Sequence, residues 1–171
     1  MSEFTPLWQQ PSHPDRIEVV KSDQPYKSYA RSLISLPAGA SFAKISTAAF
    51  VERDTYISVT TGKDSRIELN SDIVYCNHSC NPSLIFDVTR FEVRVAEDRP
   101  LAVGDHLTYF YPSTEWKMVQ PFRCQCGAGP DKCLGFVFGA SNIEPPVLMR
   151  YWLNEHIHQL LKEKTQASAE G

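Results

Sequence analysis

The chain has 171 residues, enough for one domain with a single core and short for two. Hydrophobic residues make up 42% and charged residues 22%, a composition typical of a globular protein and too apolar for an intrinsically disordered one. The formal net charge of -3 argues against a surface that neutralises many phosphates, so we expect no direct nucleic-acid partner.

In chain order, residues 1–16 contain three prolines and few apolar residues in register, which predicts a loosely attached lead-in, partly ordered where Phe4, Leu7 and Trp8 dock on the domain. Short apolar runs rich in β-branched residues follow, and turn residues such as Pro37-Ala38-Gly39 and Val103-Gly104-Asp105 separate them. Such runs predict a mainly β domain made of small sheets. The runs are Ile17 to Val20, Ser41 to Phe50, Tyr56 to Thr60, Arg66 to Leu69, Leu84 to Val88 and Phe91 to Val95.

The C-terminal part of the chain predicts one helix. Pro145-Pro146 suits a first helical turn, where a missing N–H costs nothing. An apolar stripe at helical spacing follows, formed by Met149, Leu153, Ile157 and Leu160. We expect this helix to pack on the flank of the domain and to fray after about Lys162.

The chain has five cysteines, and three of them, Cys124, Cys126 and Cys133, lie within ten residues. An odd, clustered set indicates metal ligation plus a spare thiol more than a disulfide framework. Zinc prefers four soft ligands in a tetrahedron, so three thiolates need a fourth partner, either Cys80 or a histidine. The alternative is three reduced cysteines in a glycine-rich loop.

The sequence contains no apolar run near the roughly 20 residues that cross a bilayer. Its first residues, Met-Ser-Glu-Phe-Thr-Pro, lack the basic and apolar regions of a secretory signal. We therefore expect an intracellular protein, nuclear or cytoplasmic, without a membrane partner.

Polar and thiol residues interrupt the strand-like runs in the segment from Tyr75 to Pro82. Asn77 and His78 in this segment either hydrogen-bond a ligand or satisfy buried backbone groups. The later run from Val103 to Tyr111 is a turn followed by an aromatic strand, which by itself predicts a core strand.

In their order along the chain, these segments resemble the SET domain and its post-SET zinc loop. The resemblance covers residues 26 to 140, and in size the chain is similar to short stand-alone fungal SET proteins. It rests on Asn77-His78-Ser79-Cys80-Asn81-Pro82, the pattern Gly104-x-x-Leu107-Thr108-x-x-Tyr111, Cys124-Gln125-Cys126 and Cys133-Leu134-Gly135, with Leu36-Pro37-Ala38-Gly39 as the turn after the first strands.

The resemblance implies a mainly β, SET-domain fold of small curved β-sheets with a knot-like crossing, in which the Asn-His segment passes under a later stretch. A post-SET zinc loop and a C-terminal helix complete it. The chain then divides into a lead-in at 1–16, the SET domain at 17–115, the post-SET zinc segment at 116–140, and a C-terminal helix and tail at 141–171.

The resemblance also implies an S-adenosylmethionine-dependent methyltransferase acting on a lysine-type amine, most simply a protein lysine methyltransferase. The Tyr111 hydroxyl would lie beside the sulfonium methyl and align the amine. Asn77 and His78 would contact the cofactor, and Phe122 and Leu134 would roof its adenine. On the family pattern, a structural Zn²⁺ would be held by Cys80, Cys124, Cys126 and Cys133.

A sulfonium is already an excellent leaving group, so the enzyme must mainly hold the nitrogen, the methyl carbon and the sulfur in line. A free lysine amine has a pKa of about 10.4. A narrow aromatic channel would lower that pKa, because it disfavours the ammonium form. Tyr109, Phe110 and Tyr111 are the candidates for its walls.

Lys27-Ser28-Tyr29 occupies the place of the family's early Gly-x-Gly, which puts a tyrosine side chain, Tyr29, at the cofactor site. The alternative function is therefore a SET-fold protein with lost or altered activity, either an interaction module or an enzyme on a small molecule. The acidic net charge suits a basic peptide substrate such as a histone tail, and a small-molecule amine is the other option.

Overall fold

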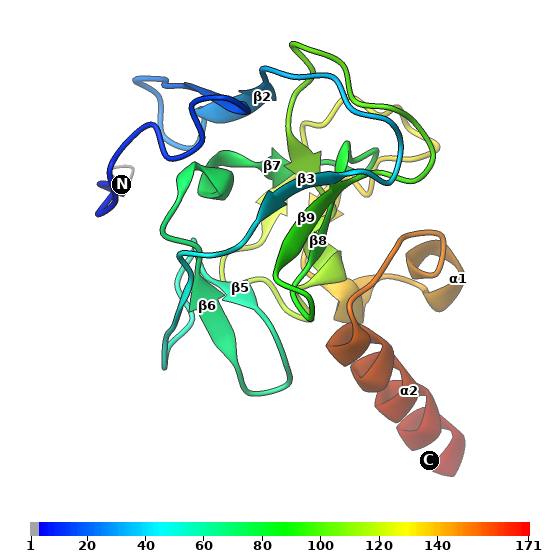
Figure 1. Cartoon of the computed structure of the whole chain (residues 1–171). Helices are drawn as coiled ribbons and strands as arrows, with labels where there is room; N and C mark the ends of the chain where they lie inside the picture. The colour runs from blue at the N-terminus through cyan, green and yellow to red at the C-terminus, as the bar shows by residue number, and fades with distance from the viewer. Residues whose placement is uncertain (1–3) are drawn as a thin grey trace.

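The computed structural model describes residues 4–171, so the first three residues of the predicted lead-in lie outside it. Small β-sheets joined by loops form the body of the molecule, and a long helix, α2, projects from one side at the C-terminus (Figure 1). The predicted mainly β architecture with a C-terminal helix is confirmed. Across residues 4–171, no helix is long and apolar enough to cross a membrane.

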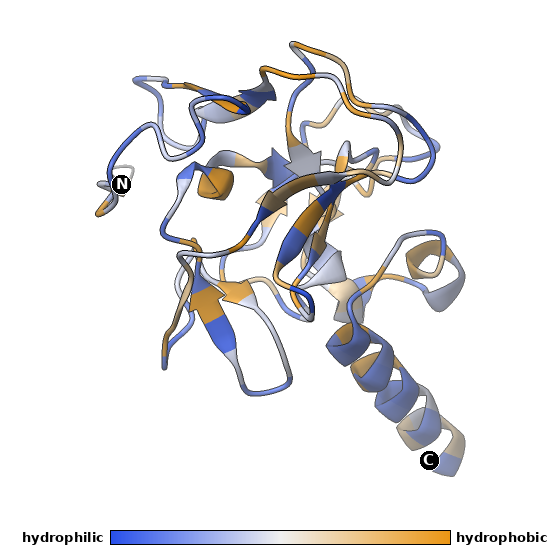
Figure 2. Cartoon of the chain, in the orientation of Figure 1, coloured by the Kyte–Doolittle hydropathy of each residue, from blue (hydrophilic) through white to orange (hydrophobic). Residues whose placement is uncertain are grey.

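The central sheet has three antiparallel strands, with β9 (Glu92–Val95) between β3 (Ser41–Lys44) and β8 (Leu84–Asp87). Val93 and Val95 of β9 are buried, whereas Glu92 and Arg94 are half-buried, as the alternating sequence predicts. In Figure 2, hydrophilic and hydrophobic residues alternate along β9 in the same way.

Two further small sheets are antiparallel. In one, β1 (Ile17–Val20) pairs with β2 (Tyr29–Ser32). In the other, β6 (Arg66–Glu68) lies between β4 (Ala49–Phe50) and β5 (Val59–Thr60). The predicted runs 41–50 and 56–60 are thus longer than the strands they contain.

Local hydrogen bonds explain why β5 begins only at Val59 and not at Tyr56, where the predicted run begins. The Ser58 hydroxyl donates to the Thr55 carbonyl oxygen at 2.9 Å and accepts the Thr55 amide at 3.0 Å, which holds these residues in a turn.

The segment of Asn77 runs beside a segment that follows much later in the chain. β7 (Asn77–His78) pairs in parallel with β10 (Thr108–Tyr109), and the chain forms β8 and β9 between them. The predicted aromatic strand ends early, because Tyr111 begins a short 3₁₀ helix, η2 (Tyr111–Ser113). A second one, η1 (Asp72–Tyr75), precedes β7.

The cysteine-rich segment is enclosed by two antiparallel strands, β11 (Phe122–Arg123) and β12 (Phe136–Val137). A third 3₁₀ helix, η3 (Ala140–Asn142), leads to the C-terminal part of the chain.

The C-terminal helix does not run continuously from Pro145 as predicted, because the structure has two helices there. α1 (Pro145–Leu148) ends after one turn, and α2 (Glu155–Glu170) begins after an irregular stretch. Met149, expected on the apolar stripe, is 54% exposed. The fraying expected after Lys162 is also absent, since α2 continues to Glu170.

The side chain of Asn154 explains why the helix restarts where it does. This residue is 1% exposed and precedes α2. Its amide nitrogen donates to the carbonyl oxygens of Phe86 and Ser113, and its oxygen accepts the backbone N–H of Val88. These bonds tie the start of α2 to β8 and η2, and no helix-period pattern reveals them.

The buried side chains form two clusters. The larger one fills the space between the sheets and includes Phe42, Ile67, Phe86 and Val93. The smaller one packs the C-terminal part against the sheets through Phe110, Leu148, Leu153, Ile157 and others. The Phe110 ring stacks on that of Tyr151 at 3.6 Å between centroids.

Candidate functional site

A cavity of about 1030 Å³ lies where β7, β10 and η2 meet. Five of the predicted site residues line it: Tyr29, Asn77, His78, Tyr111 and Phe122. Leu134 is not among its lining residues and lines a smaller groove with Phe136 and Phe138 instead. The structure therefore brings together all the predicted cofactor and catalytic residues except Leu134.

Tyr29 stands at the edge of β2 as one wall of the cavity. Its ring stacks on the His106 ring, with centroids 4.5 Å apart and planes 16° from parallel. The Tyr29 side chain is thus packed flat against a neighbouring loop.

Asn77 and His78 both make defined hydrogen bonds. The Asn77 side-chain amide donates to the Ser28 carbonyl oxygen at 3.0 Å, which ties β7 to the residue before β2. His78 Nδ1 accepts the backbone N–H of Tyr111 at 3.1 Å, and its Nε2 lies 3.4 Å from the Cys80 sulfur. These side chains do satisfy backbone groups, one of the two alternatives open from the sequence.

The protonation of His78 follows from these contacts. Burial lowers its pKa to about 4, so the ring is neutral near pH 7. Because Nδ1 accepts a hydrogen bond, the ring hydrogen is on Nε2 and points at the sulfur of Cys80. His78 therefore connects the backbone of Tyr111 to a cysteine of the predicted metal site.

Tyr111 lies among aromatic rings at the base of the cavity. Its centroid is 4.7 Å from that of Tyr109 and 6.0 Å from that of Phe122. Its hydroxyl donates to the Cys76 carbonyl oxygen at 3.2 Å. Burial raises the pKa of the Tyr111 phenol, so the hydroxyl keeps its proton at neutral pH.

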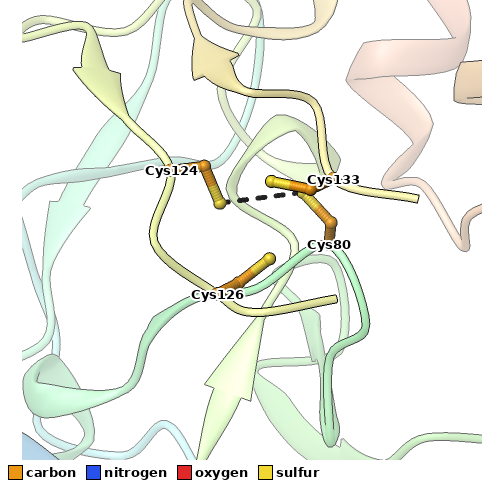
Figure 3. A group of neighbouring side chains, drawn as sticks. All are labelled: Cys80, Cys124, Cys126 and Cys133. Atoms are coloured by element: carbon orange, nitrogen blue, oxygen red, sulfur yellow. Dashed lines mark hydrogen bonds between the residues drawn. The ribbon is translucent and has the colours of Figure 1, made fainter. Parts of the chain in front are cut away.

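The four cysteines that the family resemblance puts on zinc converge in the structure (Figure 3). Their sulfurs all lie within 4.8 Å of one another, and those of Cys80 and Cys124 are 3.8 Å apart. In a tetrahedron with Zn–S bonds of about 2.3 Å, sulfurs are roughly 3.8 Å apart. The cluster therefore has the size that a bound zinc ion needs.

The electrostatics of the cluster also suit a cation. Burial raises the pKa of Cys80 to about 11. Burial also opposes ionisation of Cys126, but hydrogen bonds from the backbone of Cys80 and Ala128 lower its pKa to about 7. Backbone amides of Leu134 and Gly135 point at the sulfurs of Cys80 and Cys133 at 3.3 and 3.4 Å. A divalent metal would supply the positive charge that allows these clustered thiols to ionise together.

The fifth cysteine, Cys76, lies apart from this group. It is 1% exposed within the larger core, and burial raises the pKa of its thiol. It is the spare thiol that the odd cysteine number predicted.

The N-terminal segment contributes a wall of the cavity that sequence reasoning did not assign. Phe4 lines the cavity, and its ring centroid lies 5.6 Å from that of Tyr75 and 6.2 Å from that of Tyr56. The only sequence signal is the presence of Phe4, Leu7 and Trp8 among polar residues.

Asp72, at the start of η1, holds this segment in place. The carboxylate, on a residue with 0% exposure, accepts the Trp8 indole N–H at 2.8 Å, the Gln10 amide at 2.7 Å and the Ser12 backbone N–H at 2.9 Å. The docking predicted for Phe4 and Trp8 is therefore confirmed, whereas Leu7 is exposed. The predicted loose attachment is wrong, because this segment is fastened to Asp72, about 60 positions away in the chain.

Sequence reasoning also missed Glu115, an acidic residue that lines the cavity and is 8% exposed. Its two carboxylate oxygens accept the Thr60 backbone N–H at 3.1 Å and the Thr60 hydroxyl at 2.7 Å. Between Leu107 and Trp116 it is the single charged residue, a signal that would have singled it out.

The amino-acid sequence was compared with protein families and with curated proteins, and it is similar to a curated methyltransferase. No protein-family model matches it. A protein of Aspergillus flavus named Methyltransferase flvH is 58% identical over 169 residues, which cover 99% of this chain and 94% of the relative.

Proposed function

Because the chain belongs to the family of Methyltransferase flvH from Aspergillus flavus, we propose that it is an S-adenosylmethionine-dependent methyltransferase of the SET type. The proposed acceptor is a lysine-type amine nitrogen. The observation that carries the proposal is the convergence of the SET-like motif residues Asn77, His78 and Tyr111 on one cavity.

The shape and chemistry of the cavity support this function. Its volume of about 1030 Å³ lies at the upper end of the roughly 300–1,000 Å³ usual for small-molecule sites. Its walls combine aromatic rings with many polar and charged side chains, among them Lys27, Arg99 and Glu115. A nucleoside with a charged tail and an alkylamine fit such a lining.

The cofactor would supply an activated methyl group on a sulfonium, and the protein would position the amine. Tyr111 is suited to this because its ring is packed on several sides and its hydroxyl is fixed by the Cys76 carbonyl. With its proton donated there, the phenol oxygen keeps lone pairs that can accept an N–H of the incoming amine. Holding the reacting atoms in line is the main catalytic requirement.

Cys80, Cys124, Cys126 and Cys133 would hold a structural Zn²⁺ in this proposal. Four thiolates close the coordination sphere, so the ion would stabilise the fold of the cysteine segment and leave no position for a reacting water. Cys126 also lines the cavity, so the order of this segment affects the cavity wall.

Calorimetric titration of S-adenosylmethionine into the purified protein tests the cofactor, and transfer of a labelled methyl group tests the reaction. The acceptors are a lysine-containing basic peptide and free lysine, which separate a protein substrate from a small molecule. We expect saturable binding and transfer to one of them. Absence of both heat and thermal stabilisation on adding the cofactor would contradict the proposal.

A further inference from the structure

The cavity contains a buried carboxylate, that of Glu115, which has no role in the proposed function as described so far. Glu115 lies two residues after η2, and its backbone N–H donates to the Tyr111 carbonyl oxygen at 2.9 Å. The chain therefore carries this acid directly beside the tyrosine that would align the amine. Its negative charge also raises the pKa of both Tyr109 and Tyr111, although burial is the larger cause for each.

No cation balances this carboxylate among the described residues. Within residues 4–171, no Lys, Arg or His nitrogen lies within 4.0 Å of a Glu115 carboxylate oxygen. Besides burial, the nearby charge of Asp54, which has the same sign, raises the pKa of Glu115. A buried charge without a partner is costly, so such a group in a cavity favours a ligand of opposite charge.

The carboxylate is oriented and still has bonding capacity. Thr60 of β5 binds one oxygen through its N–H and the other through its hydroxyl. The two oxygens have about four lone pairs, of which Thr60 uses two and the Thr114 side chain a third, so the carboxylate can accept a further hydrogen bond from a ligand in the cavity.

We propose that Glu115 binds the substrate as an ammonium ion and accepts the proton that its nitrogen must lose before it can be methylated. This inference rests on the proposed function and extends it by assigning the amine-binding group. It commits the substrate to an amine that is cationic in solution.

The step is a proton transfer within a hydrogen-bonded ion pair. An N–H bond of the ammonium breaks and an O–H bond forms on Glu115, which leaves a neutral amine with a free lone pair and a neutral carboxylic acid. Burial raises the pKa of Glu115, against the hydrogen bonds of Thr114 and Thr60, and the same burial lowers that of the amine. The proton then passes to solvent after the product leaves.

Two probes of equal length test the charge dependence without requiring turnover. Butylammonium chloride and 1-butanol are titrated into the ¹⁵N-labelled full chain, with and without S-adenosylhomocysteine, and the Thr60 amide resonance is followed. Because a hydrogen bond to a charged group adds about 1.5–3 kcal/mol, we expect butylammonium to bind at least roughly tenfold more tightly.

The variants then separate recognition from structure. Glu115→Gln should lose the preference for butylammonium, and Glu115→Asp should retain part of it. The exposed control Glu97→Gln should behave as the wild type. If Glu115 had a purely structural role, Glu115→Gln would weaken the binding of both probes equally.

Equal binding of both probes by the wild type, binding of neither, or an unchanged preference in Glu115→Gln would overturn the inference. These outcomes are independent of the proposed function, whose failure would appear as absent cofactor binding. The first two outcomes are measured on the wild type and so do not depend on whether Glu115→Gln folds.

Discussion

His78 shows how one side chain links the cysteine cluster to the cavity. Its two ring nitrogens contact the Tyr111 amide and the Cys80 sulfur, which lie on different segments. Hydrogen-bond partners that orient the ligand residues are a common feature of metal sites. Order in the cysteine cluster is therefore transmitted to the backbone of the tyrosine proposed to align the amine.

Replacing Tyr111 by Phe removes one hydroxyl and keeps the ring packing. We expect methyl transfer to fall by about 100-fold, because misplacing a reacting group slightly has effects of that size. Loss of the hydrogen bond to Cys76 should cost only about 1 kcal/mol of stability. Transfer of labelled methyl, with calorimetric cofactor binding as the control, checks this. An undiminished rate would show that the hydroxyl is not used.

Asp72 predicts a pH dependence of stability. Burial raises its pKa, but the hydrogen bonds from Gln10, Trp8 and Ser12 outweigh burial, so the folded-state pKa is lowered. The unfolded value is about 3.9. The stabilisation is therefore fully present above about pH 4 and is lost as the pH falls through the folded-state pKa.

Urea unfolding of the wild type and Asp72→Asn between pH 7 and pH 3 measures this effect. At pH 7 the variant should be less stable by about 1–3 kcal/mol, because buried donors lose an acceptor. The difference should shrink toward pH 3. A difference that is independent of pH would mean that the Asp72 charge does not hold the N-terminal segment.

At the scale of elements, β7 and β10 form the base of the cavity. Their parallel pairing puts His78 opposite Tyr109, so the segments with the two SET-like motifs are direct neighbours. The Ser79 amide extends the pairing by donating to the Tyr109 carbonyl oxygen at 3.0 Å. The cavity residues are thus fixed by backbone pairing as well as by side-chain contacts.

Asn154 predicts how strongly α2 is joined to the sheets. Replacing it by Ala leaves the Val88 N–H and the Phe86 carbonyl without their partner in the protein interior. We expect a loss of about 2–4 kcal/mol in unfolding free energy, since each buried unsatisfied group costs about 1–3 kcal/mol. The exposed control Asn142→Ala should change it by less than about 0.5 kcal/mol. Equal effects of both variants, measured by urea unfolding, would contradict this role.

At the scale of the whole molecule, the cysteine cluster joins distant parts of the chain. Cys80 follows β7, and the other three cysteines lie between β11 and β12. Tyr151, which precedes α2, donates its hydroxyl to the Cys80 carbonyl oxygen at 2.8 Å. Metal binding at this point would therefore stabilise the cavity wall and the C-terminal packing together.

We predict about one zinc per chain in freshly purified protein, measured by elemental analysis. Chelation should lower the melting temperature and weaken cofactor binding, because metal-binding energy contributes to folding energy. Cys133→Ser should lose the metal, whereas Cys76→Ala, which changes the cysteine outside the cluster, should keep it. Metal-free wild-type protein of full stability would rule out a structural zinc.

The sequence by itself determined the features that depend on neighbouring residues. Alternation predicted β9, turn residues separated the strands, and cysteine spacing together with the family resemblance identified the four clustered thiols. Local patterns suffice there because side-chain periodicity decides which face of a strand is buried.

Tertiary structure alone decided the attachment of residues 4–16 to Asp72, the break before α2 at Asn154, and the placing of Glu115 in the cavity. Each depends on buried polar groups that find partners far away in the chain. Such pairing follows from which groups lose water on folding, and no local period in the sequence encodes that.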